Sequence, residues 1–257
     1  MPYAEVSGIR IYYESFGDDI KGRSPIVLIH GSTVTGKIDW EDIAPRLAND
    51  YRVFVLDCRG HGNSDGTHSY SFQEMANDVA EFILKMGYER AHIIGHSNGG
   101  NVALLTLVEH PGVTQSAVLQ AANAYVTPYL IEREPIVLDP DYYALNDPGE
   151  VKQMIAVHGP KHGEDYWREL LIMTMKEIIS EPNYTPDDLA KVRRPTFVIM
   201  GSEDKVNAPD RHAQFIAENI PGAELWIPER TGHNVHLERP AEWSEKVLDF
   251  LLRRGRE

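Results

Sequence analysis

The sequence predicts an α/β fold in which a mostly parallel central sheet is covered by helices on both faces. The short segment 26–29 is continuously apolar, as expected of a strand that is buried on both faces of a parallel sheet, and 52–56 is expected to be a second buried strand. Segments with helical spacing alternate with such strands along the chain. This alternation requires right-handed crossovers and therefore favours parallel pairing.

The expected strands can be placed in order along the chain. Residues 9–16 alternate like a half-buried strand, and residues 5–6, just before Ser7 and Gly8, would pair with them as a hairpin. Six further strands are expected to be buried, at 26–29, 52–56, 91–94, 117–121, 196–200 and 224–227.

Helical spacing of apolar residues fills the intervals between these strands. In the segment 71–86, Ser71 and Glu74 match a capping box, and Gly87 marks the end of the helix. The helix that begins at Asn98 is expected to stop before Pro111. The expected helices of this core are 40–47, 71–86, 98–109, 210–219 and 241–253.

The stretch 123–192 interrupts the alternation. It has no convincing buried strand, and its seven prolines stand between short helical patterns at 150–157 and 164–179. A structureless loop of this length is improbable inside a compact domain. We therefore expect a small helical cap at 123–192, inserted over one end of a core made of residues 1–122 and 193–257.

Composition excludes several classes of protein. A formal net charge of −14 works against binding nucleic acid or an anionic membrane surface. The first residues lack a secretory signal pattern, and no apolar run approaches the roughly 20 residues of a membrane helix. The single cysteine, Cys58, excludes an internal disulfide and suits a reducing compartment. We expect a soluble cytoplasmic protein, and the sequence gives no indication of its oligomeric state.

Residues with catalytic chemistry follow several of the expected strands. In open α/β sheets, ligands bind beyond the carboxyl ends of the strands. Ser32 follows the strand 26–29, Ser97 follows 91–94, Asp204 follows 196–200, and His233 follows 224–227. The sequence therefore brings a serine, an acid and a histidine to one edge of the sheet.

Ser97 is the expected nucleophile. It is the centre of Gly95-His96-Ser97-Asn98-Gly99, a G-x-S-x-G pattern between a strand and a helix. Such a serine occupies a strained turn that displays its hydroxyl, and a β-carbon at either glycine would collide with a neighbouring strand or helix. The pattern alone is common by chance, so its place between strand and helix is what identifies the site.

His233 and Asp204 are the expected partners of this serine. Of eleven histidines, His233 is singled out because it lies in the loop after the last strand, where an imidazole can reach the serine and act as general base. Asp204 is the expected acid that orients His233, in preference to Glu203. Asp57 is expected to brace the turn 59–62 instead.

Two backbone amides are expected to form an oxyanion hole. One belongs to Asn98, directly after the nucleophile, and the other to Ser32, in the loop after the first buried strand. Each such donor typically contributes about 3 kcal/mol to transition-state stabilisation.

The chain resembles the α/β-hydrolase superfamily over nearly its whole length. The His30-Gly31 loop, "DCRGHGNSD", "GHSNGG", "GSED" and "GHNVHLERP" occur in the order found in that superfamily. The segments "AANAYVT" and "GHNVHL" and the short cap also resemble its valacyclovir hydrolase (biphenyl hydrolase-like) branch. The resemblance implies an α/β-hydrolase fold with a Ser-Asp-His triad, and cleavage of esters of small acyl groups, α-amino acyl groups included.

One residue departs from the pattern of that branch. Its members carry an aspartate directly after the nucleophile, suited to a substrate ammonium group, and this chain has Asn98 there. A neutral amide supplies no opposite charge, so a neutral acyl group is favoured.

We therefore expect a serine hydrolase that cleaves carboxylic esters of small to medium acyl groups and needs no metal or cofactor. The same triad would also suit a lactonase, a C–C hydrolase or a perhydrolase, and a non-catalytic receptor for a small ligand can share the fold. The residues expected to bind substrate are Asn98, Val206, Tyr143 and Trp167. A wider apolar set would form a lid over Ser97, although helical spacing makes most of its members more typical of a cap core: Tyr142, Tyr143, Met154, Trp167, Leu170, Met173 and Met175.

Overall fold

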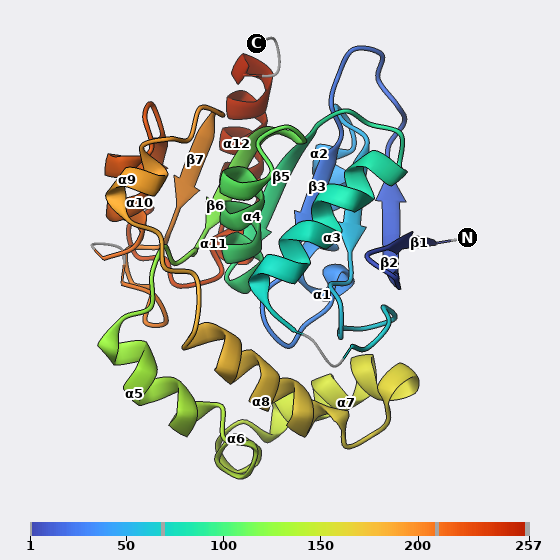
Figure 1. Cartoon of the computed structure of the whole chain (residues 1–257), viewed down its shortest axis with the longest axis vertical. Helices are drawn as coiled ribbons and strands as arrows, with labels where there is room; N and C mark the ends of the chain where they lie inside the picture. Colours follow the sequence, from blue (N-terminus) through green and yellow to red (C-terminus); the bar gives the residue numbers. More distant parts are fainter. Residues whose placement is uncertain (1, 68–69, 209–210, 255–257) are drawn as a thin grey trace.

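An eight-stranded sheet forms the centre of the computed structural model, which describes residues 2–67, 70–208 and 211–254 (Figure 1). The sheet order is β1-β2-β4-β3-β5-β6-β7-β8. β1 and β2 pair antiparallel, β2 pairs antiparallel with β4, and the remaining neighbours are parallel. The strands are β1 (Tyr3–Val6), β2 (Ile9–Phe16), β3 (Ile26–Ile29), β4 (Val53–Leu56), β5 (Ala91–His96), β6 (Thr114–Gln120), β7 (Thr196–Ile199) and β8 (Glu224–Trp226). The α/β fold expected from the sequence is confirmed.

Strand β3 is the point at which the order of the sheet reverses. The chain moves from β3 to β4 on one side and then crosses to β5 on the other. At the carboxyl ends of β3 and β5 the two loops therefore run in opposite directions. A crevice forms between loops that separate at such a switch point.

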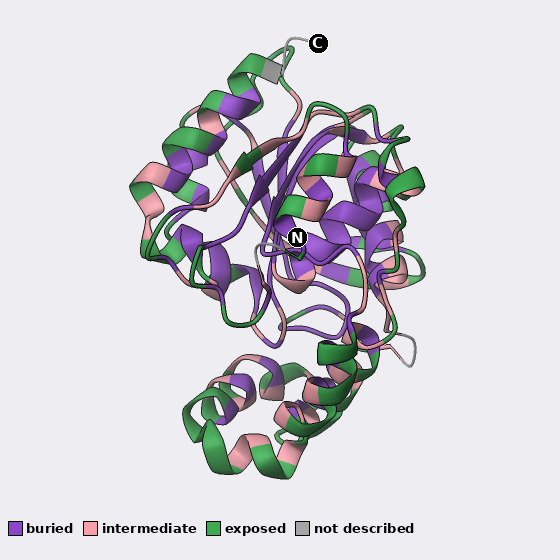
Figure 2. Ribbon diagram, turned by 90° about the vertical axis from the view of Figure 1, so that its left-hand side faces the viewer, coloured by how far each residue is buried: buried purple, intermediate pink, exposed green. Residues whose placement is uncertain are grey.

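Helices cover both faces of the sheet because successive strand residues point to opposite sides. Val27 and Ile29 join the core beneath α3 (Phe72–Lys85), α4 (Asn98–Glu109) and α10 (Ala213–Asn219). Ile26 and Leu28 join the core beneath α1 (Gly36–Trp40), α2 (Ala44–Leu47) and α12 (Pro240–Arg254). Figure 2 shows the resulting buried centre between two layers of helices.

Two expected helices differ from the structure. The segment 40–47 holds the end of α1 and the separate short helix α2, because Pro45, at the start of α2, lacks the amide that a continuous helix would need. Helix α10 begins at Ala213 rather than at residue 210, which lies outside the described residues. Helix α3 has the expected start, since the Ser71 side chain accepts a hydrogen bond from the Glu74 amide.

The insertion between β6 and β7 is helical. Helices α5 to α8, which we call the cap helices, lie beyond the carboxyl edge of the sheet (Figure 1). They are α5 (Pro128–Val137), α6 (Pro140–Asn146), α7 (Pro148–His162) and α8 (Tyr166–Ile178). Pro128, Pro140 and Pro148 each occupy the first turn of a helix, where a missing amide costs nothing. These three prolines of the insertion therefore begin helices, whereas Pro135 and Pro160 lie inside α5 and α7.

The chain enters and leaves the cap at one place. Tyr125 and Asn183 form an antiparallel bridge, and the Tyr184 amide donates to the Ala124 carbonyl oxygen at 2.8 Å. After this neck, α9 (Pro186–Leu189) contacts α10, and Leu189 is part of the core beneath the sheet. Within the described residues, no helix has both the length and the apolar character needed to cross a membrane.

Candidate active site

The turn between β5 and α4 has a strained backbone at Ser97. Its φ of 55° and ψ of −121° lie outside the regions that residues with a β-carbon normally adopt. A β-carbon on Gly95 would lie 1.9 Å from the Gly99 carbonyl oxygen, and one on Gly99 would lie 2.3 Å from the Ile29 carbonyl oxygen. Both glycines are therefore required for the close approach of α4 to β3 and β5, as the sequence pattern predicts.

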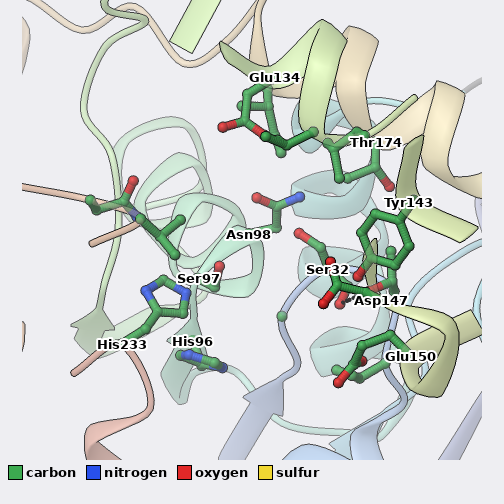
Figure 3. Close-up of a pocket in the computed structure, with 18 of the residues that line it drawn as sticks. Ser32, His96, Ser97, Asn98, Glu134, Tyr143, Asp147, Glu150, Thr174 and His233 are labelled. Carbon is green, nitrogen blue, oxygen red and sulfur yellow. Dashed lines mark hydrogen bonds between the residues drawn. The ribbon is translucent and has the colours of Figure 1, made fainter. Parts of the chain in front are cut away.

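A cavity of about 570 Å³ lies between the carboxyl edge of the sheet and the cap helices (Figure 3). The sheet side contributes Ser32, Ser97, Asn98 and His233, so residues from three separate loops line one space. The cap side contributes polar and acidic residues as well as aromatic ones, among them Glu134, Tyr142, Tyr143, Asn146, Asp147, Glu150, Gln153 and Thr174.

His233 is oriented by Asp204. The His233 Nδ1 atom lies 2.8 Å from Asp204 Oδ2, and the amides of Val206 and Asn207 donate to Asp204 Oδ1 at 2.8 Å and 2.9 Å. Burial raises the pKa of Asp204, but the bonds from His233 and from the two amides outweigh burial, and the pKa lies below its ordinary value. The carboxylate thus stays ionised and accepts the Nδ1 proton, which leaves Nε2 available as a base.

Ser97 and His233 lie next to each other on the wall of the cavity (Figure 3). Among the described residues no hydrogen bond joins the Ser97 hydroxyl to His233 in this state. Hydrogen bonds of this kind are often long before substrate binds. The geometry brings serine, histidine and aspartate together in the expected order.

The competing acids lie elsewhere. Glu203 is exposed. Asp57 is buried and accepts hydrogen bonds from the amides of Gly36 and Asn63, at 3.0 Å and 2.9 Å. Asp57 therefore braces the loop after β4, in agreement with the sequence interpretation.

The two expected oxyanion donors face the same cavity from neighbouring loops. Asn98 is the first residue of α4, where a backbone amide has no acceptor within the helix. Ser32 lies in the loop after β3, and that loop is held by a hydrogen bond of 2.8 Å from the Gly31 amide to Asp39 Oδ2.

Asp39 is a site residue that the sequence analysis missed. Its carboxylate accepts the Gly31 amide, lies 2.9 Å from His96 Nδ1 and lies 3.2 Å from His236 Nε2. His236 is fully buried, and its Nδ1 accepts a hydrogen bond of 2.8 Å from Gln120. Burial raises the pKa of Asp39, but His96 and His236 outweigh burial and hold the pKa well below its ordinary value.

The donor atoms of Asp39, His96 and His236 lie within 4.8 Å of one another, a spacing that a metal site would also have. The carboxylate already accepts hydrogen bonds from both rings and from the Gly31 amide. We therefore interpret Asp39 as a hydrogen-bonding hub. It joins the loop of Ser32, the residue before Ser97 and the helix that follows His233.

The expected substrate-binding residues divide into two groups. Asn98, Tyr143 and Val206 line the cavity. Trp167 does not: it is 5% exposed and belongs to a separate apolar cluster inside the cap, with Val151, Met154 and Leu171. The expectation for Trp167 is therefore wrong, because helix α8 turns this side chain towards α7. The expected apolar lid is also more polar than predicted, since Glu134, Asp147 and Glu150 line it.

Comparison with known proteins identifies the family of this fold. A model of the alpha/beta hydrolase family matches residues 26–246. The serine hydrolase BPHL of Mus musculus is 27% identical over 264 residues, which cover 96% of this chain and 84% of that protein. A 2-hydroxy-6-oxo-6-(2'-aminophenyl)hexa-2,4-dienoic acid hydrolase of Metapseudomonas resinovorans is 26% identical, covering 98% of this chain and 91% of its own.

Among solved structures, the enol-lactonase from Burkholderia xenovorans LB400 has a TM-score of 0.80 at 21% identity and covers 98% of this chain and 100% of its own. At that identity the likeness concerns the fold. The family model matches most of the chain, and the fold matches along its whole length. The protein therefore belongs to the alpha/beta hydrolase family.

Proposed function

We propose that the protein is a serine hydrolase that cleaves carboxylic esters of small to medium acyl groups. The observation that carries the proposal is the strained turn at Ser97 beside the His233–Asp204 pair, on the wall of one cavity. A serine is a weak nucleophile until an adjacent base accepts its proton, and this arrangement supplies the base and the group that orients it.

The reaction would proceed in two stages. His233 Nε2 takes the proton of the Ser97 hydroxyl while Oγ attacks the ester carbonyl, and the amides of Ser32 and Asn98 stabilise the oxyanion. The imidazolium then protonates the leaving alcohol, and an acyl group remains on Ser97. Water, deprotonated by His233, attacks this acyl-enzyme; the bond between the acyl carbon and Ser97 Oγ breaks, the carboxylic acid leaves, and the imidazolium returns its proton to Oγ. Apart from water, each stage uses protein groups, so the proposal includes no metal or cofactor.

The size and charge of the cavity support a small neutral substrate. A volume of about 570 Å³ lies within the usual range for sites that bind one small molecule. Glu134, Asp147 and Glu150 line the cap side, where Arg133 is paired with Glu134. The remaining negative charge disfavours a substrate that carries a carboxylate, such as a dienoic acid. A neutral ester or lactone is therefore favoured over the C–C cleavage named for one relative.

Covalent labelling tests the proposal. A fluorophosphonate should modify Ser97, as located by peptide mass spectrometry, and the Ser97→Ala variant should remain unlabelled. The same preparation should hydrolyse short p-nitrophenyl esters. Failure to label Ser97 would favour a receptor that binds a ligand without turning it over. Labelling together with turnover of lactones but not of open-chain esters would favour a lactonase. We also propose a cytoplasmic location, in keeping with the free, buried thiol of Cys58.

A further inference from the structure

Glu177, on cap helix α8, is a buried acid that the proposed reaction does not use. It is 4% exposed, and neither carboxyl oxygen has a hydrogen-bond partner among the described residues. A buried polar group without a partner is unfavourable and rare in folded proteins, so each instance calls for an explanation. The carboxyl group of Glu177 is therefore placed to bind a polar group that the protein itself does not supply.

Glu177 faces a small recess that adjoins the main cavity. The recess has a volume of about 10 Å³, enough for one water-sized group. Gly31, Ser32 and Asn98 line both the recess and the main cavity, so the residues of the proposed oxyanion hole lie between the two spaces. The recess is completed by His30, Cys58, His61, Tyr70, Met75, Gly99 and Val102.

Asn98, which lines the same recess, also carries an unpaired polar atom. The Asn98 Nδ2 atom is buried and has no hydrogen-bond partner among the described residues. In Figure 3 the Asn98 side chain extends from the Ser97 turn towards the side of the cavity where Ser32 and Thr174 lie. The recess is thus lined by two residues with unsatisfied buried polar groups, the side-chain donor of Asn98 and the carboxyl group of Glu177.

The charges around Glu177 favour its neutral form. Burial raises its pKa well above the ordinary value, and the nearby carboxylates of Glu181 and Glu74 raise it further. Arg59, the cation beside Glu74, is paired with Glu74 and Asp78. A neutral carboxylic acid offers one donor and one good acceptor, and its natural ligand is a neutral group that both donates and accepts.

We propose that this recess is a subsite for the hydroxyl group of a 2-hydroxyacyl ester. The inference rests on the proposed ester hydrolysis, which places the substrate carbonyl oxygen between the Ser32 and Asn98 amides. A substituent on the adjacent carbon then lies next to the recess that those residues share. Its hydroxyl accepts a hydrogen bond from Asn98 Nδ2 and donates one to Glu177. An ammonium group has no lone pair for the Asn98 amide, so the hydroxyl satisfies both partners and the ammonium does not.

The test compares three matched substrates: methyl propionate, methyl lactate and methyl alaninate, assayed by proton release. The wild type should favour lactate over propionate by about tenfold in kcat/KM, the effect of one to two hydrogen bonds. In Glu177→Leu the ratio of lactate to propionate should fall towards one. A ratio cancels any general effect of the substitution on activity. Glu169→Gln, an exposed acid on the same helix, should keep the wild-type ratio.

A second variant keeps the test valid if Glu177→Leu does not fold. Asn98→Ala removes the side-chain donor and leaves the backbone amide, so its ratio should also fall. Turnover of propionate without a preference for lactate in the wild type would overturn the subsite and leave the esterase proposal intact, with the recess holding water. A preference for methyl alaninate would overturn the hydroxyl subsite, because the recess would then bind an ammonium group instead. Failure of all three esters, with Ser97 unlabelled, would instead contradict the esterase proposal.

Discussion

The Asp39 carboxylate lies 2.9 Å from Nδ1 of His96, the residue that precedes the nucleophile. The same oxygen accepts the Gly31 amide at 2.8 Å, so one buried charge fixes both the Ser97 turn and the loop of the proposed oxyanion hole. Through His236 the carboxylate also reaches the short helix that follows His233. Asp39 contacts none of the three proposed triad residues directly, and it acts by positioning the segments that carry them.

Replacing Asp39 by asparagine should lower kcat by about 10- to 100-fold, because displacing catalytic groups by about 1 Å has effects of this size. KM should change little, since the cap walls of the cavity are untouched. Steady-state kinetics on a p-nitrophenyl ester gives both constants. Asp42→Asn, an exposed acid nearby in sequence, is the matched control. An equal loss of activity in both variants would contradict a positioning role.

Ser97→Gly should abolish hydrolysis and at the same time stabilise the fold. The serine backbone, at φ 55° and ψ −121°, stores strain of about 1–3 kcal/mol, which glycine does not incur. Glycine is also more flexible in the unfolded chain, which offsets about 0.5–1 kcal/mol of this stabilisation. A net increase of roughly 1 kcal/mol in the free energy of unfolding is therefore expected. Urea unfolding measures the gain. Ser97→Ala removes the hydroxyl but keeps the strain, so equal stability of the two variants would contradict the strain argument.

Gly99→Ala should destabilise the protein by about 3 kcal/mol or prevent folding, because overpacking against backbone cannot be relieved by rotating a side chain. The added β-carbon would lie 2.3 Å from the Ile29 carbonyl oxygen and 2.5 Å from that of His30. Gly112→Ala is the control, since nothing lies within 4 Å of a β-carbon there. Thermal denaturation of the two variants checks the prediction, and similar melting temperatures would refute it.

Asp204 should make stability depend on pH in the acid range. Its pKa is lower in the folded protein than the ordinary value of about 3.9, so its contribution is present above that value. The contribution is lost as pH falls through the lowered pKa. Asp204→Asn should therefore lose less free energy of unfolding than the wild type between pH 6 and pH 3. Urea titrations across this range measure the difference, with the exposed Asp187→Asn as control. Parallel curves for wild type and Asp204→Asn would rule out the contribution.

The sequence predicts most of the sheet and the positions of Ser97, Asp204 and His233 because these depend on local signals. Buried strands are continuous apolar runs, and the turn at Ser97 needs glycines at fixed spacing. The role of Asp39 depends instead on approach to His96 and His236, which are 57 and 197 residues away in the chain. No local pattern encodes such a meeting.

The cap helices show the same limit of prediction from sequence. Helical spacing groups Trp167 with Leu171 on one face of α8, but the spacing does not say whether that face meets substrate or another helix. The structure shows that this face packs within the cap. Glu177, two turns further along, faces the sheet instead, and only the fold reveals that it borders a recess at the proposed oxyanion hole.

The neck at Tyr125 and Asn183 brings the two ends of the cap insertion together after β6, and α9 lies between this neck and β7. Residues paired in an antiparallel bridge lie about 5 Å apart, so the segment between them can change in length or sequence without breaking a ladder hydrogen bond of the sheet. The walls that select the substrate can therefore diverge during evolution while the residues proposed to cleave it stay in place.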